Sequence, residues 1–329
     1  MFQKDEIIKV LVPNVVNSGY DYRLDASADV GDLVSISVMN KVYVGLVIGA
    51  GDGNIPAEKI KSVLTIHGAC LPKTTVQWIK KMSDWTMMSM GAVLKLIVGA
   101  ADFGKINNSK FPIVDYFDTG KVRLNPEQKA AADSIDISGF NVHLLDGITG
   151  SGKTQVYFDA VRRAYGSGKS VLVMMPEIAL TAQFIGRFAE RFGAAPIVWH
   201  SGLTSARRRA IWRNVLDGKI KIVIGTRSAL FLPWQDLGLI VVDEEHDSSY
   251  KQEEMGNYHA RDMAILMAKI ADIPIILASA TPSFETIKNV RTGKYKISKL
   301  TSRFGGATLP SVEIVDMRKK ELRVQIHNS

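Results

Sequence analysis

Two groups of residues in this sequence have the types and spacing that nucleotide chemistry requires. The first is 147–154, Gly-Ile-Thr-Gly-Ser-Gly-Lys-Thr, which follows an apolar run and precedes a stretch with helical spacing. This is the G-x-x-x-x-G-K-[ST] pattern of a phosphate-binding loop, in which Lys153 reaches the β- and γ-phosphates and Thr154 places a hydroxyl on Mg²⁺. A glycine turn that contains Lys-Thr by chance is the alternative. The loop residues that would cradle the phosphates through their backbone N–H groups are Gly147, Gly150, Ser151 and Gly152.

The second group is an acidic cluster, Asp243-Glu-Glu-His246, at the end of the apolar run 237–242. Carboxylates next to a buried strand are costly to desolvate unless a cation lies beside them. In a protein with a phosphate loop, Asp243 would hold Mg²⁺ through water and Glu244 would accept a proton from the attacking water. His246 would connect the nucleotide site to a neighbouring motif. A surface cluster that caps the next helix is the alternative, but the two groups together indicate a nucleoside triphosphatase that uses ATP and Mg²⁺.

Composition narrows the class of protein. The chain has 329 residues, enough for two domains, and 46% of them are hydrophobic, which is typical of a globular protein. Its single cysteine excludes a disulfide framework. We expect a cytoplasmic protein without a membrane partner, because the N-terminus lacks a signal-peptide pattern and the apolar run 91–101 is short and contains Lys95. The net charge of +8, most of it in residues 106–329, indicates a polyanionic partner or a device for solubility.

The pattern of apolar residues changes along the chain. Residues 1–66 contain short strand-like runs at 7–12, 33–38, 43–48 and 60–66, and helical spacing follows at 75–85 and 90–98. Residues 101–122 have little periodicity. From residue 125 onward, predicted strands at 142–145, 171–175, 197–199, 220–225, 239–242 and 275–278 alternate with predicted helices at 153–165, 182–192 and 206–216. This alternation predicts a parallel sheet with helices on both faces, which binds ligands at the carboxyl ends of its strands.

Seven short motifs occur in a characteristic order. They are 147–157 (Gly-Ile-Thr-Gly-Ser-Gly-Lys-Thr-Gln-Val-Tyr), 176–181 (Pro-Glu-Ile-Ala-Leu-Thr), 200–203 (His-Ser-Gly-Leu), 225–231 (Gly-Thr-Arg-Ser-Ala-Leu-Phe), 243–252 (Asp-Glu-Glu-His-Asp-Ser-Ser-Tyr-Lys-Gln), 258–262 (Tyr-His-Ala-Arg-Asp) and 279–283 (Ser-Ala-Thr-Pro-Ser). With these motifs residues 124–318 resemble the PriA family of bacterial superfamily 2 DNA helicases. The resemblance implies an α/β RecA-like P-loop NTPase lobe, preceded by a small β-rich α+β DNA-binding domain.

The resemblance also implies roles for single residues of the lobe. Gln128 stands where this class of helicase reads adenine with a side-chain amide, and the alternative is a surface residue near a helix start. Thr181, Thr226 and Arg227 would contact the DNA backbone. The segment with Tyr250, Lys251 and Tyr258 resembles a loop that couples DNA contact to ATP hydrolysis by stacking on bases, unless the tyrosines simply pack in the core. The basic run 207–213 is either solvated surface or part of the DNA track.

The N-terminal region is similar, more loosely, to the 3′ DNA-binding domain of the same family. By resemblance, Tyr20, Asp21 and Lys61 enclose the last nucleotide of a nascent leading strand, and Asp21 accepts a hydrogen bond from its free 3′-hydroxyl. The alternative is that Tyr20-Asp21-Tyr22 is a turn at the edge of a strand. The family has a glycine near Met39-Asn40 that is absent here, which is a departure from the pattern of the pocket.

We therefore expect three parts: a 3′ DNA-end-binding domain at 1–104, a linker at 105–123 in place of the family's winged helix, and the first RecA-like lobe at 124–329. The family's second lobe, with its arginine finger, and its zinc module are missing from this chain. Zinc is therefore expected only in that missing C-terminal part. Without the second lobe and its arginine finger, we expect the chain to hydrolyse ATP slowly by itself.

The function expected from the resemblance is that of an ATP-dependent helicase in replication restart and primosome assembly. It would recognise branched DNA and forks with a 3′-hydroxyl leading-strand end, and translocate 3′ to 5′ along single-stranded DNA. Its partners by resemblance are the single-stranded DNA-binding protein and primosome proteins. The alternatives are a non-catalytic fragment that recognises forks, and an unrelated superfamily 2 translocase subunit that shares the lobe.

Overall fold

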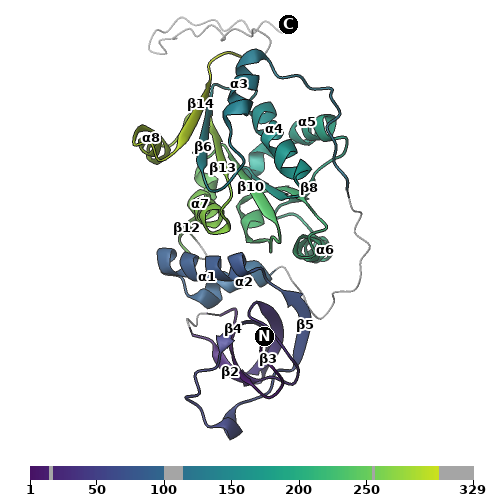
Figure 1. The fold of residues 1–329 in the computed structure, drawn as a ribbon, viewed down its shortest axis with the longest axis vertical. Helices are drawn as coiled ribbons and strands as arrows, with labels where there is room; N and C mark the ends of the chain where they lie inside the picture. The colour runs from purple at the N-terminus through teal and green to yellow at the C-terminus, as the bar shows by residue number, and fades with distance from the viewer. Residues whose placement is uncertain (15–17, 100–113, 254–255, 304–329) are drawn as a thin grey trace, which may run out of the picture.

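The computed structural model describes residues 1–14, 18–99, 114–253 and 256–303 (Figure 1). Along its long axis, an antiparallel sheet at the N-terminal end is followed by two helices, which lie between that sheet and a larger parallel sheet flanked by helices. The fold class expected from the sequence is confirmed.

The N-terminal sheet has five antiparallel strands in the order β2-β1-β4-β3-β5. Alternate residues such as Val34 and Ile36 point into its core, as the period of two predicts. Met39 and Asn40 have φ values of 44° and 63°, the left-handed pair of a tight hairpin turn between β3 and β4. The strand expected at 60–66 lies further along the chain, since only Ser62 makes an isolated bridge there. The strands are β1 (Ile7–Leu11), β2 (Tyr20–Arg23), β3 (Asp32–Val38), β4 (Lys41–Ala50) and β5 (Thr65–Cys70), with a 3-10 turn, η1, at Ala57–Lys59.

Two helices, α1 (Lys73–Thr86) and α2 (Met90–Val98), attach this sheet to the lobe. The Trp78 indole on α1 donates a 3.1 Å hydrogen bond to the carbonyl of Met263. In the other direction, the Trp212 indole of the lobe donates to the carbonyl of Ile97 at 2.8 Å. One buried apolar cluster runs from Leu11 through both helices into the lobe. The two parts therefore share a continuous core.

The lobe contains a seven-stranded sheet in the order β14-β6-β13-β10-β7-β9-β8, and all its neighbouring strands run parallel. Five central strands are buried along most of their length, as their continuous apolar runs predict. The strand β14 at the edge was not expected from the sequence. The strands are β6 (Val142–Gly147), β7 (Ser170–Met174), β8 (Ile197–Trp199), β9 (Ile222–Gly225), β10 (Leu237–Asp243), β13 (Ile275–Ser279) and β14 (Lys296–Leu300).

Helices cover both faces of this sheet (Figure 1). One face packs against α3 (Pro126–Ser134), α4 (Lys153–Gly166) and α5 (Ala182–Phe192). The other packs against α6 (Ser205–Leu216) and α7 (Ala260–Ala271), and α1 and α2 join the same cluster. The remaining elements are a short hairpin of β11 (Lys251–Gln252) and β12 (Tyr258–His259), α8 (Phe284–Arg291), and the 3-10 turns η3 (Glu177–Ala179), η4 (Arg227–Phe231) and η5 (Ser248–Tyr250).

The described part of the expected linker, 114–123, contains no helix or strand. It runs along α5, where the backbone N–H groups of Phe117 and Thr119 donate to the carbonyls of Phe192 and Arg191. Residues 105–113 lie outside the described residues. The described part, 114–123, reaches the candidate nucleotide site through Lys121, Val122 and Arg123.

Candidate nucleotide site and DNA-facing residues

The phosphate loop connects β6 to α4, as its pattern requires. Gly150 and Gly152 have φ values of 81° and 86°, a region that favours glycine. A Cβ at Gly152 would lie 2.2 Å from Nε2 of Gln128, so no other residue fits there without displacing that side chain. Lys153 donates a 2.7 Å hydrogen bond from Nζ to the carbonyl of Gly147. The lysine ammonium therefore lies across the loop, where a phosphate oxygen can replace the carbonyl.

Gln128 is buried against this loop. Its Nε2 donates to the carbonyl of Ser151 at 2.9 Å, and its Oε1 accepts from the backbone N–H of Asn125 at 3.1 Å. The second bond belongs to a capping box, in which the Asn125 side chain accepts from the backbone N–H of Gln128 at 2.8 Å. Gln128 thus lines the nucleotide pocket and fixes the loop to α3. The alternative of a surface residue does not hold, because Gln128 is 1% exposed. Its contact with adenine stays a prediction.

The acidic cluster lies beside the loop, because β10 is separated from β6 only by β13. Asp243 is buried, and it accepts from the Tyr157 hydroxyl at 2.9 Å and from the backbone N–H of Glu244 at 3.0 Å. Burial, with the adjacent charge of Glu244, raises the pKa of Asp243 to about 6. Glu244 has a φ of 47°, an unusual value for a residue with a side chain.

The side chain of His246 contacts the 279–283 motif. Its Nδ1 lies 2.7 Å from the hydroxyl of Ser279, which also accepts from the backbone N–H of Thr281 at 3.0 Å. His246 therefore contacts the 279–283 motif, and its role as a link between the nucleotide site and a neighbouring motif stays a prediction.

A cavity of about 610 Å³ brings the two groups together. Lys153, Thr154, Asp243 and Glu244 line it, along with Gln128, Gly150 and Gly152. Basic residues that the sequence analysis did not identify also line it: Lys121, Arg123 and Arg187. Two of them belong to the segment read as a linker, and only their positive charge next to the Leu124-Asn-Pro-Glu-Gln motif was a signal. The arrangement can surround a polyphosphate with positive charge.

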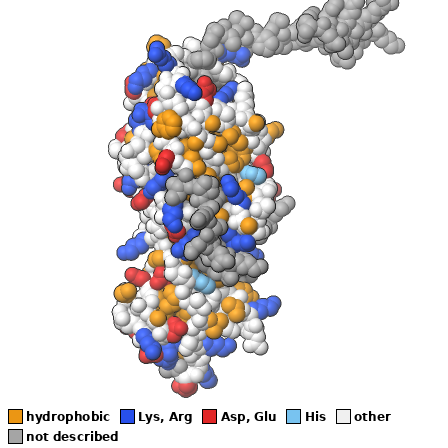
Figure 2. Space-filling view, turned by 90° about the vertical axis from the view of Figure 1, so that its right-hand side faces the viewer, with side chains coloured by type: hydrophobic (Ala, Val, Ile, Leu, Met, Phe, Trp, Pro, Cys, Tyr) orange, Lys and Arg blue, Asp and Glu red, His pale blue; other side chains and the backbone are white. Residues whose placement is uncertain are grey.

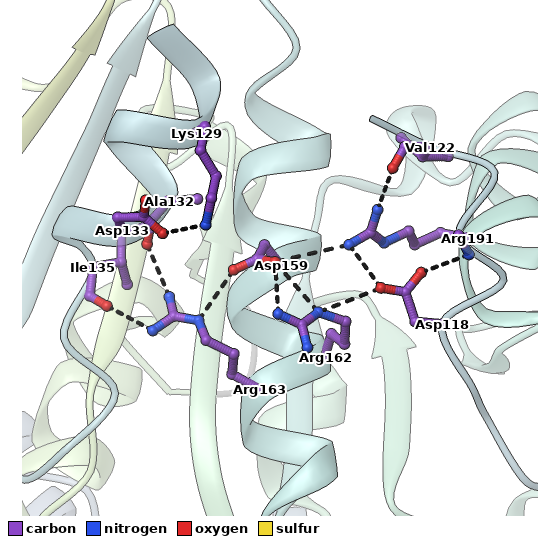
Figure 3. A network of polar contacts seen from close by, with 11 residues as sticks. Asp118, Val122, Lys129, Ala132, Asp133, Ile135, Asp159, Arg162, Arg163 and Arg191 are labelled. Carbon is purple, nitrogen blue, oxygen red and sulfur yellow. Dashed lines mark hydrogen bonds and ion pairs between the residues drawn. The ribbon is translucent and has the colours of Figure 1, made fainter. Parts of the chain in front are cut away.

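The wall that contains Lys121 and Arg123 is fixed by an ion-pair network (Figure 3). Arg191 of α5 donates a 2.7 Å hydrogen bond to the carbonyl of Val122 and forms an ion pair with Asp118 at 3.2 Å. Asp159 of α4 lies between Arg162 at 3.0 Å and Arg163 at 3.1 Å, with Arg191 at 3.7 Å. The network thus connects the 114–124 segment, α5 and the phosphate-loop helix.

The site fits Mg²⁺. Thr154 and Asp243 are the residues that would hold the ion, together with phosphate oxygens and water. Two observations support this fit: the Asp243 carboxylate is buried with a raised pKa, and the hydroxyl of Ser151 is buried with no hydrogen-bond partner among the described residues. No cluster of three or more His, Cys, Asp or Glu side chains that could hold a metal ion occurs within the described ranges.

The residues expected to contact the DNA backbone have structural bonds of their own. The Thr181 side chain caps α5 by accepting from the backbone N–H of Phe184 at 3.2 Å, and it stays exposed. Nη1 of Arg227 donates to the carbonyls of Ser249 and Lys251 at 3.0 and 2.8 Å. Thr226 lies at the end of β9, half-buried. The contacts of these residues with DNA stay predictions.

The expectation that Tyr250 and Tyr258 stack on bases needs correction. Tyr250 is 1% exposed, and its hydroxyl donates to the carbonyl of Asp243 at 2.7 Å. Tyr258 is 7% exposed, and its ring lies 5.5 Å from that of Phe231. Both rings are enclosed by the core, so in this conformation neither presents a face to a base. Lys251 between them is exposed and forms an ion pair with Glu253 at 2.8 Å.

In the N-terminal domain, Tyr20 and Asp21 are successive residues of β2, so their side chains point to opposite faces of the sheet. Asp21 is 8% exposed; its Oδ1 lies 3.3 Å from Nζ of Lys9 and accepts from the backbone N–H of Asp52 at 3.3 Å. Lys61 is exposed, and its carbonyl accepts from the backbone N–H of Arg23 at 2.9 Å. Lys61 lies outside the five strands and bonds to β2 through its carbonyl, and Tyr20 and Asp21 face opposite sides, so the structure does not bring the three side chains together on one face. Lys9, which pairs with both Asp21 and Asp52, is a cation beside Asp21 that the sequence analysis missed.

Where the face shown in Figure 2 is not covered by grey atoms, basic and acidic side chains are interspersed along the molecule. No helix among the described residues is long and apolar enough to cross a bilayer.

Comparison with known proteins assigns the two parts. A model described as DEAD/DEAH box helicase matches residues 125–290, and a model described as 3'DNA-binding domain (3'BD) matches residues 9–99. The first match contains the phosphate loop and the acidic cluster, and the second contains all but the first two residues of the antiparallel sheet, with α1 and α2.

Individual relatives match different shares of the chain. The replication restart protein PriA of Rickettsia prowazekii is 42% identical over 327 residues, which is 96% of this chain and 49% of the relative. The PriA of Haemophilus influenzae is 46% identical over 204 residues, 62% of this chain and 28% of the relative. The structure of RecG bound to a three-way DNA junction has a TM-score of 0.41 at 22% identity, and covers 71% of this chain and 35% of that one. The chain spans about half the length of the Rickettsia relatives it matches. It belongs to the DEAD/DEAH box helicase family, as a relative of the N-terminal portion of replication restart protein PriA.

Proposed function

We propose that this chain binds Mg-ATP and DNA as part of a replication restart helicase of the PriA type. In this proposal it recognises forks and branched DNA with a 3′-hydroxyl leading-strand end, and ATP hydrolysis drives 3′-to-5′ movement along single-stranded DNA. The observation that carries the proposal is the single cavity in which Lys153 lies with Asp243 and Glu244. A phosphate-binding cation and a carboxylate pair in one cavity are what phosphoryl transfer to water requires.

The residues of the chain have separate roles in the proposed reaction. When Mg²⁺ is bound, it neutralises the phosphate oxygens and polarises the γ-phosphate. Lys153 exchanges its bond with the Gly147 carbonyl for one with a phosphate oxygen. Glu244, at the rim of the cavity, orients the attacking water and accepts its proton. His246 and Ser279 carry the change at the γ-phosphate toward the 279–283 motif.

The similarity of residues 9–99 to a 3′ DNA-binding domain supports the proposed recognition of a DNA end. Asp21 would accept a hydrogen bond from the 3′-hydroxyl, and Lys9 and Lys61 would neutralise the nearby phosphate. The proposed partners are the single-stranded DNA-binding protein and primosome proteins, and the proposed compartment is the cytoplasm.

Binding of a fluorescent ATP analogue with Mg²⁺ tests the nucleotide site. Lys153→Ala should weaken binding at least about tenfold, because it removes the only phosphate-contacting ammonium of the loop. Lys129→Ala is the matched control, because the Lys129 side chain is 60% exposed and pairs with Asp133 rather than with a residue of the loop. Equal affinity of the Lys153→Ala variant and the wild type would contradict the proposal.

Binding to a model fork tests the DNA-end site. The leading-strand end carries either a 3′-hydroxyl or a 3′-phosphate, at one fixed salt concentration because phosphate contacts make affinity salt-dependent. We expect a preference for the hydroxyl that Asp21→Asn abolishes and that Asp25→Asn, a change at an exposed carboxylate of the same domain, preserves. Equal binding to both ends would instead favour a translocase lobe that does not recognise DNA ends.

A further inference from the structure

Glu245 is a buried carboxylate that the proposed reaction does not use. It follows Glu244 directly, is 0% exposed, and points away from the nucleotide cavity into the protein. Four donors surround it: Nη1 of Arg261 at 2.8 Å, the backbone N–H of Ser283 at 2.7 Å, the Ser283 hydroxyl at 3.2 Å and the Thr286 hydroxyl at 3.1 Å. A buried carboxylate is stable only when it is paired and hydrogen-bonded in this way.

The donors come from two segments that are distant in sequence from Glu245. Ser283 caps α8 and directly follows the Ser279-Ala-Thr-Pro segment. Arg261 is the second residue of α7, which begins immediately after the β11–β12 hairpin. The other strand of that hairpin is fixed by Arg227, whose guanidinium bonds to the carbonyls of Ser249 and Lys251. Glu245 therefore joins the hairpin, through Arg261, to the start of α8.

Between Asp243 and Glu245, the backbone of Glu244 has a φ of 47°. A residue with a Cβ adopts this conformation only when its surroundings compensate for the strain. The flanking residues are fixed on both sides. The Tyr250 hydroxyl donates to the Asp243 carbonyl at 2.7 Å, and the backbone N–H of Glu245 donates to the Ala278 carbonyl at 3.1 Å.

We propose that Arg261, acting through Glu245, is a positioning residue that fixes the strained turn at Glu244 and ties it to the β11–β12 hairpin. The catalytic role of Glu244 rests on the proposed function, whereas the positioning of its backbone does not. A movement of the hairpin that displaces Arg261 would release Glu245, and the Glu244 carboxylate would then lose its fixed place beside the cavity. In this way the β11–β12 hairpin influences the nucleotide site while Tyr250 and Tyr258 remain buried.

Two variants separate this role from general stability. Glu245→Gln keeps the shape of the side chain and removes the charge that pairs with Arg261. Arg261→Lys keeps a positive charge but lacks the guanidinium, whose Nη1 donates to Glu245 and Ser283 while its Nε donates to Asp262. Asp262→Asn is the matched control. Asp262 is the second carboxylate paired with Arg261, with its Oδ1 2.8 Å from Nε of the arginine, and its side chain is 46% exposed. Because water screens the exposed Asp262 carboxylate, its loss should disturb Arg261 less than the loss of the buried Glu245 charge.

The first readout is amide hydrogen exchange of residues 243–247 in the chain without nucleotide. We expect exchange at the Glu245 amide to accelerate about tenfold or more in Glu245→Gln, less in Arg261→Lys, and not in Asp262→Asn. Exchange in the central strands β7 and β13 should stay at the wild-type rate, which shows that the variants fold. If Glu245→Gln does not fold, the Arg261→Lys and Asp262→Asn pair decides the question.

The second readout is single-turnover hydrolysis at saturating Mg-ATP. The rate should fall about tenfold or more in Glu245→Gln, with the dissociation constant of the nucleotide within about twofold of wild type. Unchanged exchange at 243–247 in both variants would overturn the inference, whatever the hydrolysis rate. If the wild type does not hydrolyse ATP but exchange accelerates as expected, the proposed function fails and the positioning role stands.

Discussion

The hydroxyl of Tyr157 donates a 2.9 Å hydrogen bond to Oδ2 of Asp243, and so connects the phosphate-loop helix to the strand that carries the carboxylates. Tyr157 is fully buried, and burial raises its pKa well above the usual value, so the phenol remains a donor at neutral pH. This bond favours the charged form of Asp243 and opposes the effect of its burial.

Tyr157→Phe removes that donor, and we expect the pKa of Asp243 to rise further above about 6. A smaller fraction of the carboxylate is then ionised near pH 6.5, so more Mg²⁺ is needed for half-maximal binding of an ATP analogue. At pH 8.5 both proteins have an ionised Asp243 and the difference should shrink. Mg²⁺ titrations at the two pH values measure this.

The control for this experiment is Tyr165→Phe, the same change near the end of the same helix, where the hydroxyl accepts from the backbone N–H of Tyr116. It should leave the Mg²⁺ requirement unchanged at both pH values. A Tyr157→Phe variant with wild-type midpoints throughout would show that the bond does not influence the carboxylate.

Gly152→Ala should damage the phosphate loop for two reasons. The φ of 86° is strained for alanine, and the new Cβ would lie 2.2 Å from Nε2 of Gln128. We expect a loss of about 1–3 kcal/mol of folding stability, from the strained conformation, and weaker nucleotide binding. Urea unfolding and analogue binding measure the two effects.

Gly186→Ala is the contrasting substitution. Gly186 lies in the interior of α5, and a Cβ there would meet nothing within 4 Å. Alanine should therefore stabilise the helix by about 0.5–1 kcal/mol without changing nucleotide affinity. If both alanine variants behaved alike, the special conformation of the loop would not be what requires glycine.

The sequence predicted the sheet and the phosphate site well because each depends on local patterns. The run 197–199 and the stretch 182–192 were identified with the bounds of β8 and α5, since apolar periodicity specifies them. The edge strand β14 was missed because its residues, Lys-Ile-Ser-Lys-Leu, form neither an apolar run nor a regular alternation, and only its partner β6 decides its pairing.

The spacing of Tyr250 and Tyr258 could not predict whether their rings stack on DNA or pack in the core. Tyr250 and Tyr258 flank a polar loop, which suits either stacking on DNA or packing, and only the tertiary position of Asp243 and Phe231 selects packing. Lys121 and Arg123 were missed for a similar reason. They lie in a segment without periodicity, and Arg191 and Asp118 bring that segment to the cavity.

Trp78 should determine whether the two parts of the chain unfold together. Its ring lies 5.4 Å from that of Phe231 in the lobe, and its indole N–H bonds to the Met263 carbonyl. Trp78→Ala should cost about 3–5 kcal/mol. We expect a single urea transition in the wild type and two transitions in the variant, because the shared core no longer couples the parts.

Trp85→Ala on the same helix is the control, because Trp85 is 69% exposed. It should change stability by no more than about 0.5 kcal/mol and preserve the single transition. A Trp78→Ala variant that still unfolds in one transition would show that the contact between the parts is not what couples them.

His143 makes stability depend on pH in the acid range. It is buried on β6, with Nε2 2.8 Å from the Ser298 hydroxyl. Burial, and secondarily the charge of Lys296, lower the pKa of His143 from its usual value of about 6.5 to about 4. In the unfolded chain His143 is therefore protonated below about pH 6.5, whereas in the folded chain it is protonated only below about pH 4.

The stability that the neutral His143 allows is thus fully present above pH 6.5. As the pH falls from 6.5 to 4, the free energy of unfolding decreases by up to about 3 kcal/mol on account of this residue. His143→Gln removes the titrating group and keeps an amide that can bond to Ser298. We expect the wild type to lose more stability than the variant between pH 7.5 and 4.5 in urea unfolding. Since every other titratable group is shared, the difference isolates His143, and parallel pH profiles would mean that the folded protein accepts the proton readily.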